Sequence, residues 1–491
     1  MTNKLLDLPD RFSQAAWLRL GWAYVGLGVL ARLVQWLWGV SYWSDEAMLL
    51  LNFRTADPPA IFGALQHGQT APPLFALLQN AAFDAFGTFE QGTRLVALLA
   101  GCCACVLIWL LARRLLPLPA AVLCAGIFAF SGRLTWHAAE AKQYSTDVLL
   151  ATVLLLVATW PGKTATWRVL AAGTTGVVGV WLSHPSVFMV PAVGLALLPM
   201  AWREGVRGRW VWAGVTAACA ASFAAVYLLS IRHQQVPYLF EYWFAGGKFP
   251  DYARPWGIPA WVARSTLGVV NYPYENVSAV LLPAALLGCV AAVRRGRRGS
   301  GHGRLLAMAG MPVLFVLIAA FALRYPFGGS RVTAFLTPGV TLLVGLGFDS
   351  ALRTVRRAWQ RRIVWAVTSV VLLLMAGPML WRFAEPEHRG HLAPAVRHVQ
   401  ANAQDQEPIF VIDEAAAFRV YWPGRSFTLL EPPAAETIEV RRFWLVWSFD
   451  GDAGRRKVSR VLDTLDTRYD RTDAFVIPGG GAILYERAIE P

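Results

Sequence analysis

Long apolar runs separated by short polar segments dominate the chain from residue 16 to residue 381. Eleven of these runs approach the ~20 residues with which an α-helix crosses the hydrocarbon core of a bilayer. The predicted spans are 16–38, 93–112, 118–134, 145–160, 167–183, 186–202, 210–230, 277–293, 305–323, 332–349 and 362–381. The pattern therefore predicts an all-α polytopic membrane protein with about 11 transmembrane helices.

Composition supports this class and excludes others. Of the 491 residues, 56% are apolar and only 15% are charged, and the mean hydropathy is +0.43. Because a soluble domain is about 25% charged, this chain cannot cover a soluble surface of its size. The same figures exclude a disordered chain and a disulfide-rich secreted scaffold. All six cysteines lie in apolar stretches, where we expect small packing side chains.

The net charge of the chain is +14, and the distribution of the basic residues is typical of a membrane protein. In a soluble protein this net charge would suggest nucleic acid as a partner, which we do not expect here. Before the tail, alternate segments hold the larger share of the Lys and Arg residues, as the positive-inside rule predicts. The rule places the N-terminus in the cytoplasm. It places loops 39–92, 135–144, 231–276 and 324–331, and the tail after them, outside.

The tail from 385 to 491 has mixed charge and short strand-like runs. The strands are expected at Ile409–Ile412, Phe443–Trp447, Ala474–Ile477 and Ala482–Tyr485, with helices at Ala415–Tyr421 and Val458–Thr467. The chain is therefore expected to divide into a transmembrane module, 1–384, and a small α/β extracytoplasmic domain, 385–491.

The first outer loop carries two adjacent carboxylates, Asp45 and Glu46. Acidic residues favour the first turn of a helix, so a solvated helix N-terminus is one interpretation and catalysis is the other. Further along come His67 and Gln69, and then Pro72-Pro73, which can start a short interfacial helix.

In the second outer loop, Glu140, Gln143, Tyr144 and Asp147 are spaced i, i+3, i+4 and i+7. This spacing predicts one face of a helix that enters the membrane. Asp147 lies at the mouth of the bilayer, where acidic residues are rare unless they are functional or paired. The alternative is an ion pair with Lys142 or with an arginine.

The last outer turn places Arg324 and Arg331 on either side of a Gly-rich segment. Either guanidinium can bind a phosphate bidentately, and the alternative is snorkelling to lipid headgroups. Tyr325 lies in the same turn. His184 lies between two closely spaced spans, where it is either a packing or capping side chain or part of a substrate site.

Taken in order, these features resemble the GT-C glycosyltransferases. The Asp-Glu pair after the first span, the Pro-Pro segment, the acid in the second outer loop and the Tyr-Pro-Phe-Gly-Gly-Ser-Arg turn are similar to protein O-mannosyltransferases and lipid A aminoarabinose transferases, the family 39 type. The resemblance covers the whole chain in layout, and its specific residues lie in 41–150 and 324–348. It implies a multi-pass protein of the bacterial inner membrane.

The resemblance also implies roles for individual residues. Asp45 matches the catalytic base, with Glu46 beside it, and Asp147 matches the second-loop aspartate, with Glu140 as its rival. Arg324 and Arg331 match the basic residues that hold the lipid phosphate of the donor.

One position departs from the family. Many relatives have His or Lys directly before the Pro pair, but this chain has Ala71. His67, Gln69 or Thr70 is expected to substitute there, or the phosphate contact comes wholly from Arg324 and Arg331. Lys142, Tyr144, Tyr325 and His184 complete the candidate substrate-binding residues.

The implied reaction moves a sugar from a polyprenyl-phosphate donor to an acceptor hydroxyl on a protein, a lipid or a polysaccharide, with inversion. The residues require no cofactor, and a divalent ion at Asp45 and Glu46 is an alternative without positive indication. Two further interpretations compete with catalysis. One is a transporter or flippase of lipid-linked sugars, although no inverted repeat is visible, and the other is a non-catalytic membrane scaffold.

Overall fold

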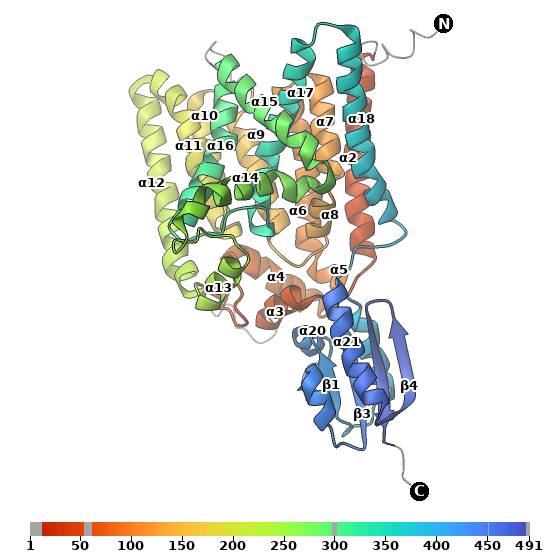
Figure 1. Ribbon diagram of the computed structural model, residues 1–491. Coiled ribbons are helices and arrows are strands. Elements are labelled where there is room, and N and C mark those ends of the chain that lie inside the picture. The colour runs from red at the N-terminus through yellow and green to blue at the C-terminus, as the bar shows by residue number, and fades with distance from the viewer. Residues whose placement is uncertain (1–11, 54–60, 297–301, 450, 488–491) are drawn as a thin grey trace, which may run out of the picture.

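The computed structural model describes residues 12–53, 61–296, 302–449 and 451–487. A bundle of long helices carries a small sheet at one end (Figure 1). Each predicted apolar run overlaps one long helix, although 118–134 extends past the end of its helix at Ala129 and 332–349 begins before its helix starts at Thr337. These helices are α2 (Gln14–Leu37), α6 (Leu95–Leu115), α7 (Leu118–Ala129), α9 (Tyr144–Ala158), α10 (Ala165–Leu182), α11 (Ser186–Arg203), α12 (Gly205–Leu229), α15 (Ser278–Gly296), α16 (His302–Phe321), α17 (Thr337–Thr354) and α18 (Ala358–Trp381).

Eight helical stretches of the described chain are long and apolar enough to cross a membrane. α7 and α9 are apolar but shorter, and α10, which contains several Gly and Thr residues, belongs to neither group. The polytopic all-α prediction is therefore confirmed, whereas the count of eleven spans stays a prediction.

Small residues allow the central helices to approach closely. At Gly288 in α15 a Cβ atom would come within 1.9 Å of the Leu343 carbonyl oxygen. At Gly347 in α17 it would come within 1.8 Å of the Ala284 carbonyl oxygen. The hydrophobic effect does not drive helices together within lipid. Close van der Waals contact between backbones, which glycine permits, therefore contributes to the packing of these helices.

Arg32 is a buried cation in α2 with a structural role. Its guanidinium donates to the carbonyl oxygens of Phe128 and Ala129, at 3.4 and 3.2 Å, and to Gly28 at 2.8 Å. The first two carbonyls lie at the C-terminal end of α7, where backbone acceptors lack helical partners. Arg32 thus caps α7 and joins it to α2.

Shorter elements fill the loops. They are α3 (Ser44–Phe53), α4 (Pro73–Phe86), α5 (Glu90–Thr93), α8 (Gly132–His137), η2 (Ile231–His233), α13 (Pro237–Ala245), η3 (Pro255–Gly257), α14 (Ile258–Tyr274), η4 (Glu275–Val277) and η5 (Arg331–Leu336). The Pro pair starts α4, as predicted. α3, α4, α5 and α13 lie at the end of the bundle that carries the sheet (Figure 1).

The tail forms a mixed sheet with strand order β2-β1-β3-β5-β4. β1 pairs in parallel with β2 and β3, and β5 pairs antiparallel with β3 and β4. The elements are α19 (Leu392–Asn402), β1 (Ile409–Ile412), α20 (Ala415–Tyr421), β2 (Thr428–Leu429), η6 (Pro432–Thr437), β3 (Arg442–Ser448), α21 (Gly451–Asp466), β4 (Asp470–Ile477) and β5 (Gly480–Glu486).

The small α/β domain is confirmed, with corrections. The four predicted strands and the helix at 415–421 are present, but α21 begins at Gly451 rather than Val458, because its charged first turns conceal the helical pattern. β2 and α19 were not predicted. The division of the chain at residue 384 stays a prediction.

One apolar core joins the sheet to the membrane bundle. Phe418 of α20 and Val396 of α19 are buried in the same cluster as Leu49 and Leu50 of α3. The other sheet face packs against α21 through residues such as Val461. Because α3 carries Asp45 and Glu46, the tail domain supports the element on which the candidate site stands.

Candidate active site

Asp45 lies where three of the predicted outer loops meet. It stands in the first turn of α3. Its Oδ1 atom is 3.2 Å from Lys142 Nζ, and its Oδ2 atom is 3.3 Å from Arg331 Nη2. Gln69 Nε2 donates to Oδ1 at 3.2 Å. Burial alone would raise the pKa of Asp45, but Lys142 and Arg331 outweigh it and hold the pKa below its usual value.

Lys142 is itself almost fully buried, with 2% of its surface exposed. Besides Asp45, it donates to Gln69 Oε1 at 2.5 Å. Burial lowers the pKa of Lys142, and the nearby Asp45 partly offsets that effect. Lys142, Gln69 and Asp45 therefore form one hydrogen-bonded unit built from two outer loops.

Glu46 points away from this unit although it follows Asp45 in the chain. Arg94 binds it bidentately, with Nε to Oε1 at 2.9 Å and Nη2 to Oε2 at 2.8 Å. The Ala141 N–H donates to Oε1 at 2.6 Å. Both members of the ion pair are buried, so Glu46 joins α3 to the second outer loop and is not free to meet a substrate.

The predicted helix face in the second loop is wrong. α9 begins only at Tyr144, so Glu140 and Gln143 precede it and do not share a helix face with Asp147. Glu140 is instead fixed from two sides, because Trp43 Nε1 donates to it at 3.0 Å and His137 Nδ1 lies 2.8 Å away. These two hydrogen bonds hold the segment in turns.

Glu140 belongs to the surroundings of Asp45. It is fully buried, and its hydrogen bond from His137 helps to lower its pKa against the effect of burial. The other ring nitrogen of His137, Nε2, forms a hydrogen bond with the Tyr272 hydroxyl at 2.8 Å. The arrangement fixes Trp43, the second residue before Asp45, in place.

Asp147 lies apart from this group. It is buried in the first turn of α9 and interacts with Ser183 and Tyr325. None of the interactions found among the described residues joins it to Asp45, Lys142 or an arginine. The proposed ion pair with Lys142 is therefore wrong, since Lys142 pairs with Asp45. His184 Nε2 is likewise buried with no hydrogen-bond partner in the described chain.

The two arginines of the last outer turn, Arg324 and Arg331, have different surroundings. Arg331 starts η5 and reaches Asp45, and its guanidinium also lies 5.3 Å from the Trp43 ring centre and 5.9 Å from that of Tyr144. Arg324 is exposed, and within the described chain its side chain has no hydrogen bond or ion pair. The Gly-rich turn therefore brings only Arg331 to the site.

Ala71, the position that departs from the family pattern, is fixed by its backbone. Gln234 Oε1 accepts from its N–H at 3.0 Å, and Gln234 Nε2 donates to its carbonyl at 3.2 Å. His67 is exposed and lies within electrostatic reach of Arg419. Thr70 accepts through its carbonyl from Gln143 Nε2 at 3.4 Å. Of the three expected substitutes, only Gln69 has a hydrogen bond to Asp45 in the described chain.

Sequence reasoning missed two cations near the site. Arg389, in the segment before α19, lies 4.1 Å over the Trp43 ring and 5.5 Å from that of Trp136. Lys248 donates to the carbonyl of Gly329 at 2.9 Å, and Gly329 is the second residue before Arg331 in the sequence. Neither residue belongs to a recognisable motif, so the sequence offered no signal for them.

The tail domain holds the segment that leads into Asp45. The Tyr421 hydroxyl accepts from the Tyr42 N–H at 2.8 Å and donates to Glu90 Oε1 at 2.9 Å. Ser44 donates to Glu414 Oε2 at 2.7 Å. Among the described residues no group of three or more His, Cys, Asp or Glu side chains could hold a metal ion.

Three comparisons relate the chain to known proteins. A family model described as dolichyl-phosphate-mannose-protein mannosyltransferase matches residues 70–228, which include α4 to α11. No curated protein sequence matches significantly.

Solved structures match almost the whole chain. ArnT from Cupriavidus metallidurans in the apo state has a TM-score of 0.51 at 12% identity, over 94% of this chain and 98% of that one. The same protein bound to undecaprenyl phosphate also has a TM-score of 0.51 at 12% identity, over 96% and 98%. The Archaeoglobus fulgidus oligosaccharyltransferase, in complex with Zn and sulfate, has a TM-score of 0.50 at 12% identity, over 94% and 73%. The chain therefore has the GT-C fold of these solved structures.

Proposed function

We propose that the protein is a membrane glycosyltransferase that moves a sugar from a polyprenyl-phosphate donor to an acceptor hydroxyl at the outer face. The observation that carries the proposal is the Asp45 carboxylate held between Lys142 and Arg331, at the point where the outer loops of a GT-C fold meet. The match to mannosyltransferases over 70–228 supports the reaction class. One similar structure contains undecaprenyl phosphate, which supports the donor class.

In this proposal Asp45 is the general base. Its lowered pKa keeps it deprotonated near neutral pH, so it can accept the proton of the acceptor hydroxyl. The acceptor oxygen forms the new bond to the anomeric carbon as the bond from that carbon to the phosphate oxygen breaks. The phosphate leaves with the electron pair as polyprenyl phosphate, and one displacement inverts the anomeric centre.

The two cations have a second task. A lipid phosphate that approaches Arg331 and Lys142 competes with Asp45 for their charge, and preorganised cations stabilise charge that develops on a leaving group. Once the phosphate has engaged them, Asp45 is less strongly held and becomes a better base. Donor binding and base activation are thus coupled through the same two side chains.

The remaining candidate residues have supporting roles in this scheme. Glu140 positions Trp43 beside the site, and Glu46 anchors α3 to the second loop through Arg94. Asp147 has no contact with the Asp45 unit in the described chain and is assigned no part in proton transfer. Arg324, which is exposed, is not required for the phosphate.

A transfer assay in detergent tests the proposal. Purified full-length protein is incubated with polyprenyl-phosphate-linked sugars and a membrane extract as acceptor, and release of polyprenyl phosphate is followed. We expect release that depends on acceptor, because an enzyme needs no sealed compartment. Sugar movement across sealed proteoliposomes without any release in detergent would instead establish a lipid-linked sugar transporter.

A further inference from the structure

A group of arginines converges at the end of the bundle predicted to face the cytoplasm, away from Asp45. Arg168 stands in the first turn of α10, and Arg304 stands in the first turn of α16. Arg168 Nη1 lies 3.6 Å from the Met200 sulfur, and Arg304 Nη1 contacts the same sulfur. The charges of Arg168 and Arg203 also act on Arg304, so each of these two guanidinium groups repels that of Arg304.

This group lacks a counter-charge. No ion pair joins Arg168, Arg203 or Arg304 to an acidic side chain in the part of the chain that the structure describes. Glu204, the nearest acid in sequence, already accepts from the Ala165 and Thr166 N–H groups at 2.5 and 2.8 Å.

Both burial and helix polarity make the arrangement unfavourable without an anion. Arg168 is only 9% exposed, and its Nε atom has no hydrogen-bond partner among the described residues. The N–H groups at the start of α10 are already bound by Glu204 and Thr164, but Arg304 lies at the N-terminus of α16, where the backbone dipole favours negative charge and disfavours cations. A phosphate at this point would pair with the guanidinium groups and satisfy the dipole of α16.

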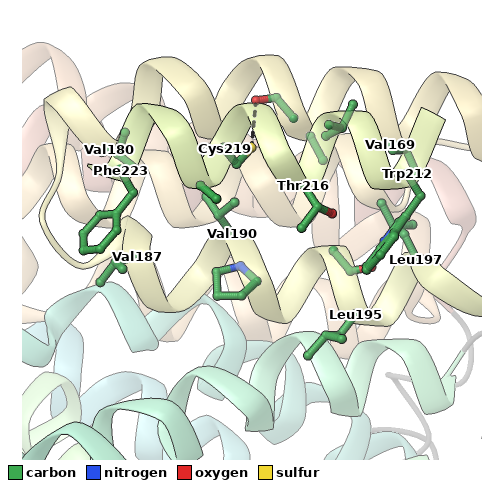
Figure 2. Close-up of a pocket in the computed structure, with 16 residues that line it drawn as sticks. Val169, Val180, Val187, Val190, Leu195, Leu197, Trp212, Thr216, Cys219 and Phe223 are labelled. Carbon is green, nitrogen blue, oxygen red and sulfur yellow. Dashed lines mark hydrogen bonds between the residues drawn. The ribbon is translucent and has the colours of Figure 1, made fainter. Parts of the chain in front are cut away.

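An apolar cavity of about 330 Å³ begins one turn away from this group, within the size range of ligand pockets. α10, α11 and α12 line it. Figure 2 shows Val169, Leu197 and Trp212 at one end of the cavity and Val180, Val187 and Phe223 at the other. Val169 follows Arg168 in the chain and Leu197 lies one helical turn before Met200, so the first end adjoins the arginines.

We propose that this is a binding site for an anionic glycerophospholipid of the inner leaflet. Its phosphate lies on Arg168 and Arg304, with Arg203 at the rim, and one acyl chain lies in the cavity between α10, α11 and α12. The charge group accounts for the anion and the adjoining cavity accounts for the chain. The proposal does not depend on the transferase activity, since none of its residues contacts the Asp45 unit.

Native mass spectrometry of delipidated full-length protein tests the charge part. Phosphatidylglycerol and phosphatidylcholine are titrated against wild type, Arg168→Gln, Arg304→Gln and the control Arg356→Gln, which changes an exposed arginine of another predicted inner segment. We expect wild type and the control to prefer phosphatidylglycerol. Each cluster variant should bind it roughly tenfold more weakly, because a charge-assisted hydrogen bond is lost. Equal weakening in the control, or no preference in wild type, would overturn the site.

A second pair of variants tests the acyl chain. Gly194 lines the cavity and Gly214 does not, and a Cβ atom at either position meets no atom within 4 Å. Gly194→Leu should fill the cavity and lower phosphatidylglycerol retention severalfold, while Gly214→Leu should leave it unchanged. If the two variants behave alike and inorganic phosphate alone displaces the lipid, the arginines bind a free phosphate and the lipid assignment is overturned.

Discussion

Asp45 and Glu46 are neighbours in the first turn of α3, and their carboxylates have different partners. Glu46 is bound by Arg94 and by the Ala141 N–H, which leaves it no capacity for a substrate. Asp45 is held by two cations and Gln69 at longer distances, 3.2 to 3.3 Å. Residues adjacent in a helix point in different directions, so one turn can supply both a reactive group and its anchor.

The first prediction contrasts these two acids. Asp45→Asn keeps the size and hydrogen bonding of the side chain but removes the proton acceptor, so turnover should fall roughly 10²–10⁴-fold while donor binding persists. Glu46→Gln should act mainly on stability, because a buried Arg94 loses its counter-charge. Transfer rates and thermal melting of both purified variants check this. A near-normal rate in Asp45→Asn would remove Asp45 as the base.

The second prediction concerns pH. Asp45 acts in its deprotonated form, so kcat/KM is lost as the pH falls through its pKa, which Lys142 and Arg331 hold below the usual value. Replacing Lys142 with Gln removes one cation and leaves burial in place. The acid limb of the profile should therefore move to higher pH in Lys142→Gln. An acid limb at the same pH in both proteins would contradict the coupling.

The third prediction separates the two arginines of the last turn. Arg331→Ala should weaken donor binding about tenfold or more, since a charged hydrogen bond to phosphate is lost. Arg331→Lys should restore only part of it, because an ammonium lacks the bidentate geometry. Arg324→Ala serves as the matched control, because Arg324 is exposed. Titration with polyprenyl phosphate gives the affinities, and equal losses at both positions would contradict the assignment.

At the scale of elements, helix contacts made through glycine decide the packing of the bundle centre. The span Arg331–Thr354, which contains α17, is the most buried of the candidate spans, since 94% of its most apolar window is buried inside the protein. α17 meets α15 backbone to backbone at Gly288 and Gly347. Such contacts leave no room for a side chain, so helices α15 and α17 tolerate little variation where they touch.

The fourth prediction tests this contact. Gly347→Leu should lower the stability by about 1–3 kcal/mol or more, because overpacking forces the helices apart. Gly377→Leu in α18 is the control, since a Cβ atom there meets nothing within 4 Å. Thermal melting in the same detergent compares the two. Equal melting temperatures would show that α15 and α17 can separate without cost.

At the scale of the whole molecule, the tail domain and the outer loops form one assembly. The Tyr421 hydroxyl binds the Tyr42 N–H, and Glu414 binds Ser44, so the tail domain holds the chain on both sides of Trp43. Arg389 adds a stacking contact with Trp43 from the segment that leads to α19. The domain is therefore placed to fix the position of α3.

The fifth prediction concerns topology. The distribution of Lys and Arg predicts a cytoplasmic N-terminus and an outer tail domain. Contacts of Asp45 with Lys142 and Arg331 require that the loops carrying them share one side, and the hydrogen bonds of Tyr421 and Glu414 to the first loop place the tail on that side too. Alkaline phosphatase fused after Pro491 should therefore be active, and a reporter that works only in the cytoplasm should be silent there. The opposite pattern would reverse the whole orientation.

The sequence by itself determined the helices and the class of the fold. An apolar run long enough to cross a bilayer is a local property, so each of the eleven runs overlaps a long helix. Four of the five strands of the tail are likewise found near their predicted places, and only β2 was not predicted. The helix predicted from Glu140 to Asp147 was wrong at its start, where the structure has turns. The hydrogen bonds that fix Glu140 come from Trp43 and His137, and the spacing of residues along the chain does not reveal such contacts.

Only the tertiary structure decided which candidate residues meet. Nothing local distinguishes Arg331 from Arg324, or Asp45 from Glu46, since the members of each pair have similar chemistry and nearby positions. Their partners lie far along the chain, as Lys142 does from Asp45 and Arg94 from Glu46, and such contacts depend on how whole helices pack. The same packing brings Arg168 and Arg304 to one sulfur atom. This contact could not be predicted, because no sequence pattern relates the first turns of α10 and α16.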